Sequence, residues 1–165
     1  MTALGVPHFS KVGYEADDLM ATLTRRMEEQ DFQTVLAATD KDLLQCLRAG
    51  VWGMDMKTFG LVGEAEVKAK FGVLPRQMAD LQALIGDSTD NVPGVKGVGK
   101  KSAALLLSEL GDLDTVYTRL SDVPYLPIRG AKSLKEQGIL KWRASNQQMH
   151  RRMSTLNCSR TSREG

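Results

Sequence analysis

The sequence is poor in aromatic residues and cysteines, and each shortage narrows the class of protein. Phe, Trp and Tyr make up 5% of the 165 residues, so a core has to be built mainly from Leu, Val, Met and Ala. The two cysteines, Cys46 and Cys158, lie far apart without a CxxC pattern or a neighbouring histidine. We therefore expect neither a zinc site nor a disulfide framework, and reduced intracellular thiols are the default.

The sequence also lacks a long apolar run and a secretion signal. Its longest apolar stretches, such as Ala103–Leu107, are far shorter than the roughly 20 residues that cross a bilayer. The N-terminal segment has neither the basic region nor the long apolar region of a signal peptide. With 42% hydrophobic and 25% charged residues, this composition predicts a globular protein of about one domain that neither spans a membrane nor is secreted.

The near-neutral net charge of +2 is a cancellation between two halves of the chain. Residues 1–90 hold 14 Asp or Glu and 9 Lys or Arg, a net charge of −5, whereas residues 91–165 hold 6 and 13, a net charge of +7. An acidic half followed by a basic half indicates two tasks in one chain and favours a nucleic-acid partner. Chance clustering of charges on solvated faces is the alternative.

Hydrophobic periodicity predicts an α/β protein in which helices and short strands alternate. The apolar run Phe32–Ala38 is the one convincing strand, and Leu4–Val6 and Val51–Met56 are weaker candidates. Because a parallel sheet needs several strands covered on both faces, either the sheet is unusually small or part of the domain is missing from this chain. Helices are expected at Asp17–Gln30, Asp42–Leu47, Glu64–Phe71, Pro75–Ile85, Lys100–Leu110, Leu113–Leu120 and Ala131–Gln137.

Three groups of acidic residues stand at boundaries between the predicted elements. Carboxylates that converge at one edge of a sheet repel one another, so cations are expected between them, and hard oxygen ligands suit Mg²⁺ or Mn²⁺. Two such ions about 4 Å apart can activate a water and stabilise the leaving oxygen in phosphodiester cleavage. Taken singly, each group also suits an ordinary helix cap or turn. The candidate metal ligands are Glu15, Asp17, Asp18, Asp40, Asp42, Asp87 and Asp90.

A glycine-rich segment precedes the predicted helix at Lys100–Leu110. Its glycines permit a tight turn, and the helix N-terminus with its lysines forms an anion site. The spacing nearly matches a nucleotide-binding GxxxxGK[ST] loop, but Lys101 replaces the Ser or Thr, and a helix rather than a strand comes before it. A helix-hairpin-helix that holds a DNA phosphate through backbone amides is the better interpretation, with an ordinary helix–helix connection as the alternative. The candidate DNA-binding residues are Gly94, Gly97, Val98, Gly99, Lys100 and Lys101.

Three segments, in this order, closely resemble the 5′-nuclease domain attached to bacterial DNA polymerase I, within the flap endonuclease family. They are GYEADDLMATL, AATDKDLLQCL and LIGDSTDNVPGVKGVGKKSAALLL. The resemblance is strong from Gly13 to Tyr117 and fades through Leu156. It implies a partial PIN-like (Rossmann-like) sheet core in residues 1–85, an all-α helix-three-turn-helix DNA-binding subdomain in 86–156 and a disordered tail in 157–165.

The resemblance implies a role for each candidate residue. The hairpin glycines and Val98 would grip duplex DNA, with K⁺ bound through backbone carbonyls and with Lys100 and Lys101 on phosphates. Asp40 and Asp42 are the implied catalytic residues. The implied metal ligands are Glu15, Asp17 and Asp18 at a first site, Asp40 close to both ions, and Asp42, Asp87 and Asp90 at a second site.

The implied function is a structure-specific 5′-3′ exonuclease or 5′-flap endonuclease that uses two Mg²⁺ or Mn²⁺ ions on flapped or nicked duplex DNA, in replication or repair. Family members carry a further N-terminal region with an Asp-Gly metal ligand and a basic helical arch. We do not expect this region in the present sequence. A catalytically incomplete DNA-binding module and a nonfunctional truncated product are therefore the alternatives. A DNA polymerase or a separate N-terminal segment is an implied partner, and a bacterial cytoplasm or nucleoid, or a DNA-containing organelle, is an implied location.

Overall fold

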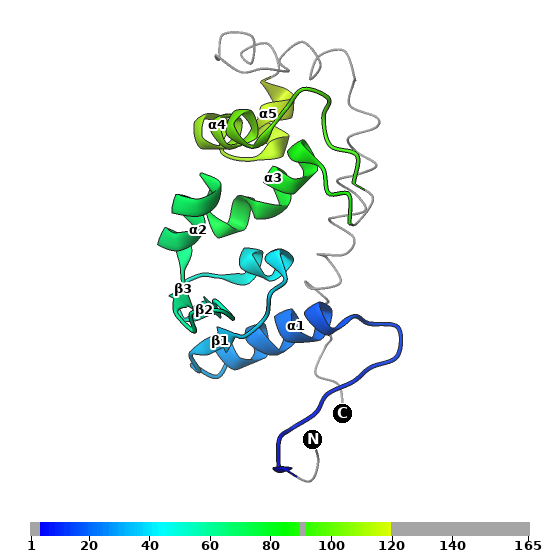
Figure 1. Cartoon of the computed structure of the whole chain (residues 1–165), viewed down its shortest axis with the longest axis vertical. Coiled ribbons are helices and arrows are strands. Elements are labelled where there is room, and N and C mark those ends of the chain that lie inside the picture. The colour runs from blue at the N-terminus through cyan, green and yellow to red at the C-terminus, as the bar shows by residue number, and fades with distance from the viewer. Residues whose placement is uncertain (1–3, 90–91, 120–165) are drawn as a thin grey trace.

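The computed structural model describes residues 4–89 and 92–119 (Figure 1). Figure 1 shows helix α1 (Ala16–Glu28) and a small sheet at one end of the molecule. Helices α4 (Lys100–Leu110) and α5 (Leu113–Thr118) lie at the other end, and α2 (Glu64–Phe71) and α3 (Met78–Ile85) lie between them. The mixed α/β fold predicted from the sequence is confirmed.

Helix α1 forms where the periodic apolar residues predict it, within two residues of the expected bounds. Asp17 and Asp18 in its first turn and Arg25 and Arg26 in its last turn complement the helix dipole. After the helix, Asp31 takes a left-handed φ of +60°, and the chain reverses. The next strand therefore runs back alongside α1.

The sheet has three strands in the order β1-β2-β3. Strand β1 (Thr34–Leu36) pairs in parallel with β2 (Val51–Met54), which pairs antiparallel with β3 (Leu61–Val62). The strands predicted at Phe32–Ala38 and Val51–Met56 are thus confirmed in shortened form. The strand proposed at Leu4–Val6 is wrong, because these exposed residues pair with no described strand, and short apolar runs form strands only where pairing supports them.

The remaining helices follow the predicted ranges closely. Helices α2 and α4 have the predicted bounds, and α5 ends two residues early. The segment predicted as a helix at Asp42–Leu47 is a 3₁₀ helix, η2 (Lys41–Cys46), which begins after Asp40 as its N-cap. The helix expected at Pro75–Ile85 divides into a 3₁₀ turn, η3 (Pro75–Gln77), and α3. Proline suits this first turn because it has no N–H to pair there.

The buried core is built from aliphatic side chains, as the low aromatic content predicts. Every buried hydrophobic residue in the described part of the chain is Leu, Val, Met or Ala, except Cys46. Most of the fully buried large side chains lie in the helical half, including Met78, Leu84 and Leu106. Truncating one such side chain to Ala typically costs about 2–5 kcal/mol. The buried side chains of the helices therefore contribute most of the core, and the segments around η2 and α3 pack against it.

The glycine-rich loop between α3 and α4 folds back on the end of α3. Val95 donates its N–H to the Leu84 carbonyl at 2.8 Å. Gly94 has φ +62°, and a Cβ built on it would lie 2.5 Å from the backbone N of Gly86. Only glycine fits such an approach of two backbones. This contact fixes where the loop leaves α3 and where α4 begins.

No helix in residues 4–89 and 92–119 is long and apolar enough to cross a bilayer. Asp90, the helix predicted at Ala131–Gln137 and the tail predicted at 157–165 lie outside the described residues. The expected boundary after residue 85, between a sheet core and a helical subdomain, stays a prediction.

Candidate active site

The first two acidic groups meet because α1 and β1 run in opposite directions. The chain enters α1 at Glu15, reverses at Asp31 and leaves β1 at Leu36. The start of α1 and the residues after β1 therefore lie at the same end of this unit. That end is where Asp40 caps η2, so the helix start and the strand end place their carboxylates around one space.

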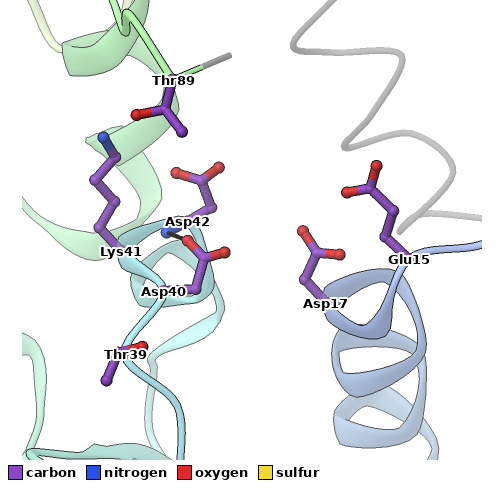
Figure 2. Close-up of a pocket in the computed structure, with 7 residues that line it drawn as sticks. All are labelled: Glu15, Asp17, Thr39, Asp40, Lys41, Asp42 and Thr89. Carbon is purple, nitrogen blue, oxygen red and sulfur yellow. Dashed lines mark hydrogen bonds between the residues drawn. The ribbon is translucent and has the colours of Figure 1, made fainter.

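A pocket of about 280 Å³ occupies this space. In Figure 2, Asp40 and Asp42 on the η2 side face Glu15 and Asp17 on the α1 side. Four carboxylates around one opening repel one another in the absence of cations. The pocket is lined by Glu15, Asp17, Thr39, Asp40, Lys41, Asp42 and Thr89.

Local hydrogen bonds fix the carboxylates near the helix starts. Oδ2 of Asp18 accepts the N–H of Glu15 at 3.1 Å, which makes Asp18 a cap of its own helix, and it is not among the residues that line the pocket. Oδ1 of Asp17 accepts the N–H of Asp18 at 3.1 Å. Oδ1 of Asp40 accepts the N–H of Asp42 at 2.9 Å. Each carboxylate has two oxygens, so one oxygen can cap a helix or turn while the other is available to the pocket.

A buried amide holds Asp42. Gln82, on α3 and 5% exposed, donates from Nε2 to Oδ1 of Asp42 at 2.5 Å. This bond joins η2 to α3 through two residues that are 40 apart in the sequence. It fixes the rotamer of an implied catalytic carboxylate from outside the pocket.

Asp87, from the third acidic group, does not line the pocket but pairs with Lys41, which does. Nζ of Lys41 lies 2.5 Å from Oδ2 of Asp87, and Oδ1 of Asp87 accepts the N–H of Thr89 at 3.0 Å. Hydrogen bonding from the Lys41 ammonium lowers the pKa of Asp87 from its ordinary value, against burial, which raises it. Asp87 is therefore a buried carboxylate held in its ionised form.

The donor set of the pocket fits a hard divalent cation, although its residues are not gathered into a complete cage. All the candidate ligands offer carboxylate oxygens, which suit Mg²⁺ or Mn²⁺. Within the described residues, no three Asp, Glu, His or Cys side chains are close enough together to hold an ion. Mg²⁺ commonly keeps several waters and binds one or two carboxylates directly. A pocket of this volume and charge therefore fits a hydrated ion better than a fully dehydrated one.

The candidate DNA-binding residues lie on the loop after α3 and on the first turn of α4. Lys100 and Lys101 are exposed there, and Gly99 begins the helix without a capping hydrogen bond from a described side chain. The predicted turn is present at Gly97, which has φ +84°. Val98 is 5% exposed, so its side chain belongs to the core. The loop follows a helix, α3, which is not the strand that a nucleotide-binding loop needs.

Two residues at the site were missed by the sequence interpretation. Lys41 lies between two acids in the segment that follows β1, and a cation between two acids is itself a signal of an ion pair. Gln82 is a polar residue on the apolar face of α3, where a buried amide needs a partner. Neither signal identifies the partner, because both contacts join segments far apart in the sequence.

Two family models divide almost the whole chain between them. Residues 1–72 match the N-terminal resolvase-like domain of 5′-3′ exonucleases, and residues 73–163 match the C-terminal SAM fold of the same enzymes. The chain belongs to the 5′-3′ exonuclease family. The resemblance identified from the three motifs is thus confirmed.

Relatives of the chain include long polymerases and shorter exonucleases. The chain is 45% identical over 115 residues to DNA polymerase I of Deinococcus radiodurans, a match that covers 70% of this chain and 12% of the polymerase. It is 31% identical over 130 residues to a 5′-3′ exonuclease of Buchnera aphidicola, covering 79% of this chain and 45% of the exonuclease. The chain therefore spans less than half the length of these relatives.

Solved structures confirm the fold over most of the chain. A T5 5′-exonuclease with divalent zinc ions bound matches with a TM-score of 0.69 and 24% identity, covering 94% of this chain and 54% of that one. A flap endonuclease of bacteriophage T5, in a complex with DNA and metal ions, matches with a TM-score of 0.68 and 23% identity over the same shares. At this identity the likeness shows the fold alone.

Proposed function

We propose that this chain is part of a structure-specific 5′-3′ nuclease that hydrolyses DNA phosphodiesters next to a 5′ flap or nick, with two Mg²⁺ or Mn²⁺ ions. The observation that carries the proposal is the pocket between α1 and η2, where carboxylates of two separate motifs face one another. Membership of the 5′-3′ exonuclease family and the metal ions in the T5 structures support it.

In this proposal the chain's carboxylates set the position of the cations. Glu15 and Asp17 would hold one ion, Asp42 would hold the other, and Asp40 would contribute to both. Asp18, Asp87 and Asp90 would act through water or through their neighbours. Such ions, once bound, supply an activated water and stabilise the leaving oxygen. The protein itself holds these carboxylates in place. Asp18 accepts the N–H of Glu15 at the start of α1, and Gln82 donates to Asp42.

We infer that the α3–α4 loop holds the DNA. The first turn of α4 offers N–H groups and two exposed lysines, Lys100 and Lys101, which suit a phosphate without reading the base sequence. Backbone carbonyls of Gly94, Gly97 and Gly99 would bind K⁺ in the same loop. The complex of the T5 flap endonuclease with DNA and metal ions supports DNA as the molecule that is bound.

The polymerase relatives support a place in replication or repair. Relatives named DNA polymerase I carry the matching segment within a much longer chain. We therefore propose that this chain works beside a DNA polymerase, on DNA of a bacterial nucleoid.

Cleavage of a 5′-labelled flap duplex tests the proposal. We expect cleavage that leaves a 5′-phosphate in Mg²⁺ or Mn²⁺, none in a chelator, and a loss of rate on the order of 100-fold in Asp40→Asn. Asp114→Asn, an exposed acid on α5, is the matched control and should cleave like wild type. Metal-independent cleavage, or an Asp40→Asn variant as fast as wild type, would contradict the proposal.

A catalytically incomplete DNA-binding module is the second candidate. It is favoured by one observation, that no three candidate ligands in the described part of the chain are close enough to hold an ion. This candidate predicts salt-sensitive binding of duplex DNA without any cleavage in Mg²⁺ or Mn²⁺. The same assay, read with a binding measurement, separates the two functions.

A further inference from the structure

Gln82 connects a deeply buried helix to a carboxylate of the acidic pocket. Its neighbours on α3, Leu81 and Ala83, are each 1% exposed, and Gln82 itself is 5% exposed. From this position its Nε2 donates to Oδ1 of Asp42, which lines the pocket, at 2.5 Å. Side chains in such a close-packed interior stay in fixed rotamers. The amide therefore belongs to the core, while the carboxylate that it holds belongs to the site.

The element that carries Asp42 benefits from such an anchor. Asp42 lies at the start of η2, a 3₁₀ helix of six residues, directly after Lys41 and the capping residue Asp40. Figure 2 shows Asp40 and Asp42 joined by the bond from the Asp42 N–H to the Asp40 carboxylate. A 3₁₀ helix has poorer hydrogen-bond geometry than an α-helix and occurs in short pieces. A contact from the packed helix α3 therefore fixes the direction of Asp42 more firmly than η2 alone would.

The proposed metal site makes the direction of each single carboxylate matter. No three acids among residues 4–89 and 92–119 are close enough together to enclose an ion, so a cation here would be held by one or two carboxylates and its own waters. With so few direct ligands, turning one carboxylate away removes a large share of the protein's hold on the ion. The amide of Gln82 carries no charge, so this contact orients Asp42 without adding a positive charge that would repel the cation.

We propose that Gln82 is a positioning residue for Asp42, whose carboxylate it keeps turned toward the pocket and toward the second cation. The inference rests on the proposed metal-dependent function. Removing a side chain that orients a metal ligand typically lowers metal affinity or activity by about 10–100-fold. Loss of the Gln82 amide should therefore weaken cation binding, although Gln82 touches no cation itself.

Titration of the whole chain with Mn²⁺, in the absence of DNA, tests the proposal. Free Mn²⁺ is measured by electron paramagnetic resonance for wild type, Gln82→Met and Gln82→Asn. Met keeps the length of the side chain without the donor, and Asn keeps the amide but is one methylene shorter, too short to reach Asp42. Both variants should bind Mn²⁺ about tenfold more weakly than wild type. If one replacement fails to fold, the other still measures the effect.

Gln77→Met is the matched control. Gln77 is also a buried glutamine, 9% exposed, but it donates to backbone carbonyls at the end of α4 and not to a pocket residue. Gln77→Met should therefore bind Mn²⁺ like wild type even though it is less stable. In an Asp42→Asn background, Gln82→Met should cause no further loss of affinity, because the carboxylate that the amide holds is absent.

The outcomes separate the inference from the proposed function. Wild-type Mn²⁺ affinity in both Gln82 variants, an equal loss in Gln77→Met, or a loss that persists in the Asp42→Asn background would overturn the inference and leave the proposed function standing. If wild type itself binds no Mn²⁺, the proposed metal-dependent function fails, and the inference fails with it.

Discussion

At the scale of single residues, an ion pair between Glu28 and Arg48 joins the end of α1 to the turn that precedes β2. Arg48 donates from Nε to Oε1 of Glu28 at 2.8 Å and from Nη2 to Oε2 at 2.5 Å. These bonds from Arg48 lower the pKa of Glu28 from its ordinary value. A lowered folded-state pKa means that the pair stabilises the fold above the unfolded-state value, and that this contribution is lost as the pH falls through the folded-state value.

The first prediction concerns this pair. Glu28→Gln should lower the free energy of unfolding by about 1 kcal/mol at pH 7, since both side chains are partly exposed. Below the folded-state pKa of Glu28, the variant and wild type should unfold alike, because the wild-type carboxyl is then neutral as well. Urea unfolding at the two pH values measures the difference; a cost that persists at the lower pH would show that the charge is not its source.

The second prediction concerns Gly94. Ala at this position would bring Cβ to 2.5 Å from the backbone of Gly86 and Ile85 at a left-handed φ, so Gly94→Ala should cost about 3 kcal/mol. Gly99 is the matched control: it has φ −95°, and no described atom lies within 4 Å of a Cβ there. Gly99→Ala should cost less than about 1 kcal/mol. If urea unfolding gives the two variants a similar loss of unfolding free energy, the close approach of the Gly94 and Gly86 backbones does not explain the cost.

The site illustrates what single residues reveal before a structure is known. Glu15 and Asp17 were expected at a first metal site, Asp42 at a second and Asp40 close to both ions, and all four line one pocket. The different fate of Asp18 follows from helix geometry, because successive residues point about 100° apart, so one of two adjacent acids caps while the other faces the pocket. Sequence spacing does not decide which of the two does so.

At the scale of elements, a buried glutamine links η3 to the end of α4. Nε2 of Gln77 donates to the carbonyls of Leu107, at 2.9 Å, and Gly111, at 2.5 Å. Its Oε1 accepts the N–H of Leu74 at 2.9 Å. One side chain therefore satisfies a backbone group in its own turn and carbonyls at a helix end 30 and 34 residues away.

The third prediction follows from this link. Gln77→Met keeps the length of the side chain but removes its hydrogen bonds, so it should lower the free energy of unfolding by about 1–3 kcal/mol. Arg76→Met, at the exposed neighbouring position, is the control and should change stability by less than about 0.5 kcal/mol. Equal midpoints of urea unfolding for Gln77→Met and wild type would contradict the account.

Elements with clear end signals were predicted best. Helices α2 and α4 match their predicted bounds because Gly72 and Gly111, with φ +77° and +91°, end them. Strand β3 could not be predicted, since two residues have no measurable periodicity and its existence depends on pairing with β2. The same dependence on pairing explains why the weak strand candidate at Leu4–Val6 is wrong.

At the scale of the whole molecule, the positive net charge of the second half of the sequence is concentrated near its C-terminal end. Residues 91–119 hold four basic and three acidic residues, whereas residues 120–165 hold nine and three. Most of the basic excess therefore falls outside the described part of the chain. The acidic pocket lies between α1 and η2, and the two hairpin lysines lie on α4. Figure 1 shows α1 and α4 toward opposite ends of the molecule. We therefore expect cleavage and DNA binding to be separable by mutation.

The measurement that tests this account most directly is binding and cleavage of one 5′-flap duplex by wild type, Asp17→Asn and the double variant Lys100→Ala, Lys101→Ala. Asp17→Asn should bind the duplex as tightly as wild type does in chelator, yet cleave it at least about 100-fold more slowly in Mg²⁺. The lysine variant should bind more weakly, with the slope of log affinity against log salt reduced by about 1.8. An Asp17→Asn variant that cleaves at the wild-type rate, or a lysine variant with an unchanged salt slope, would contradict the assignment of cleavage to the pocket and of DNA binding to the hairpin.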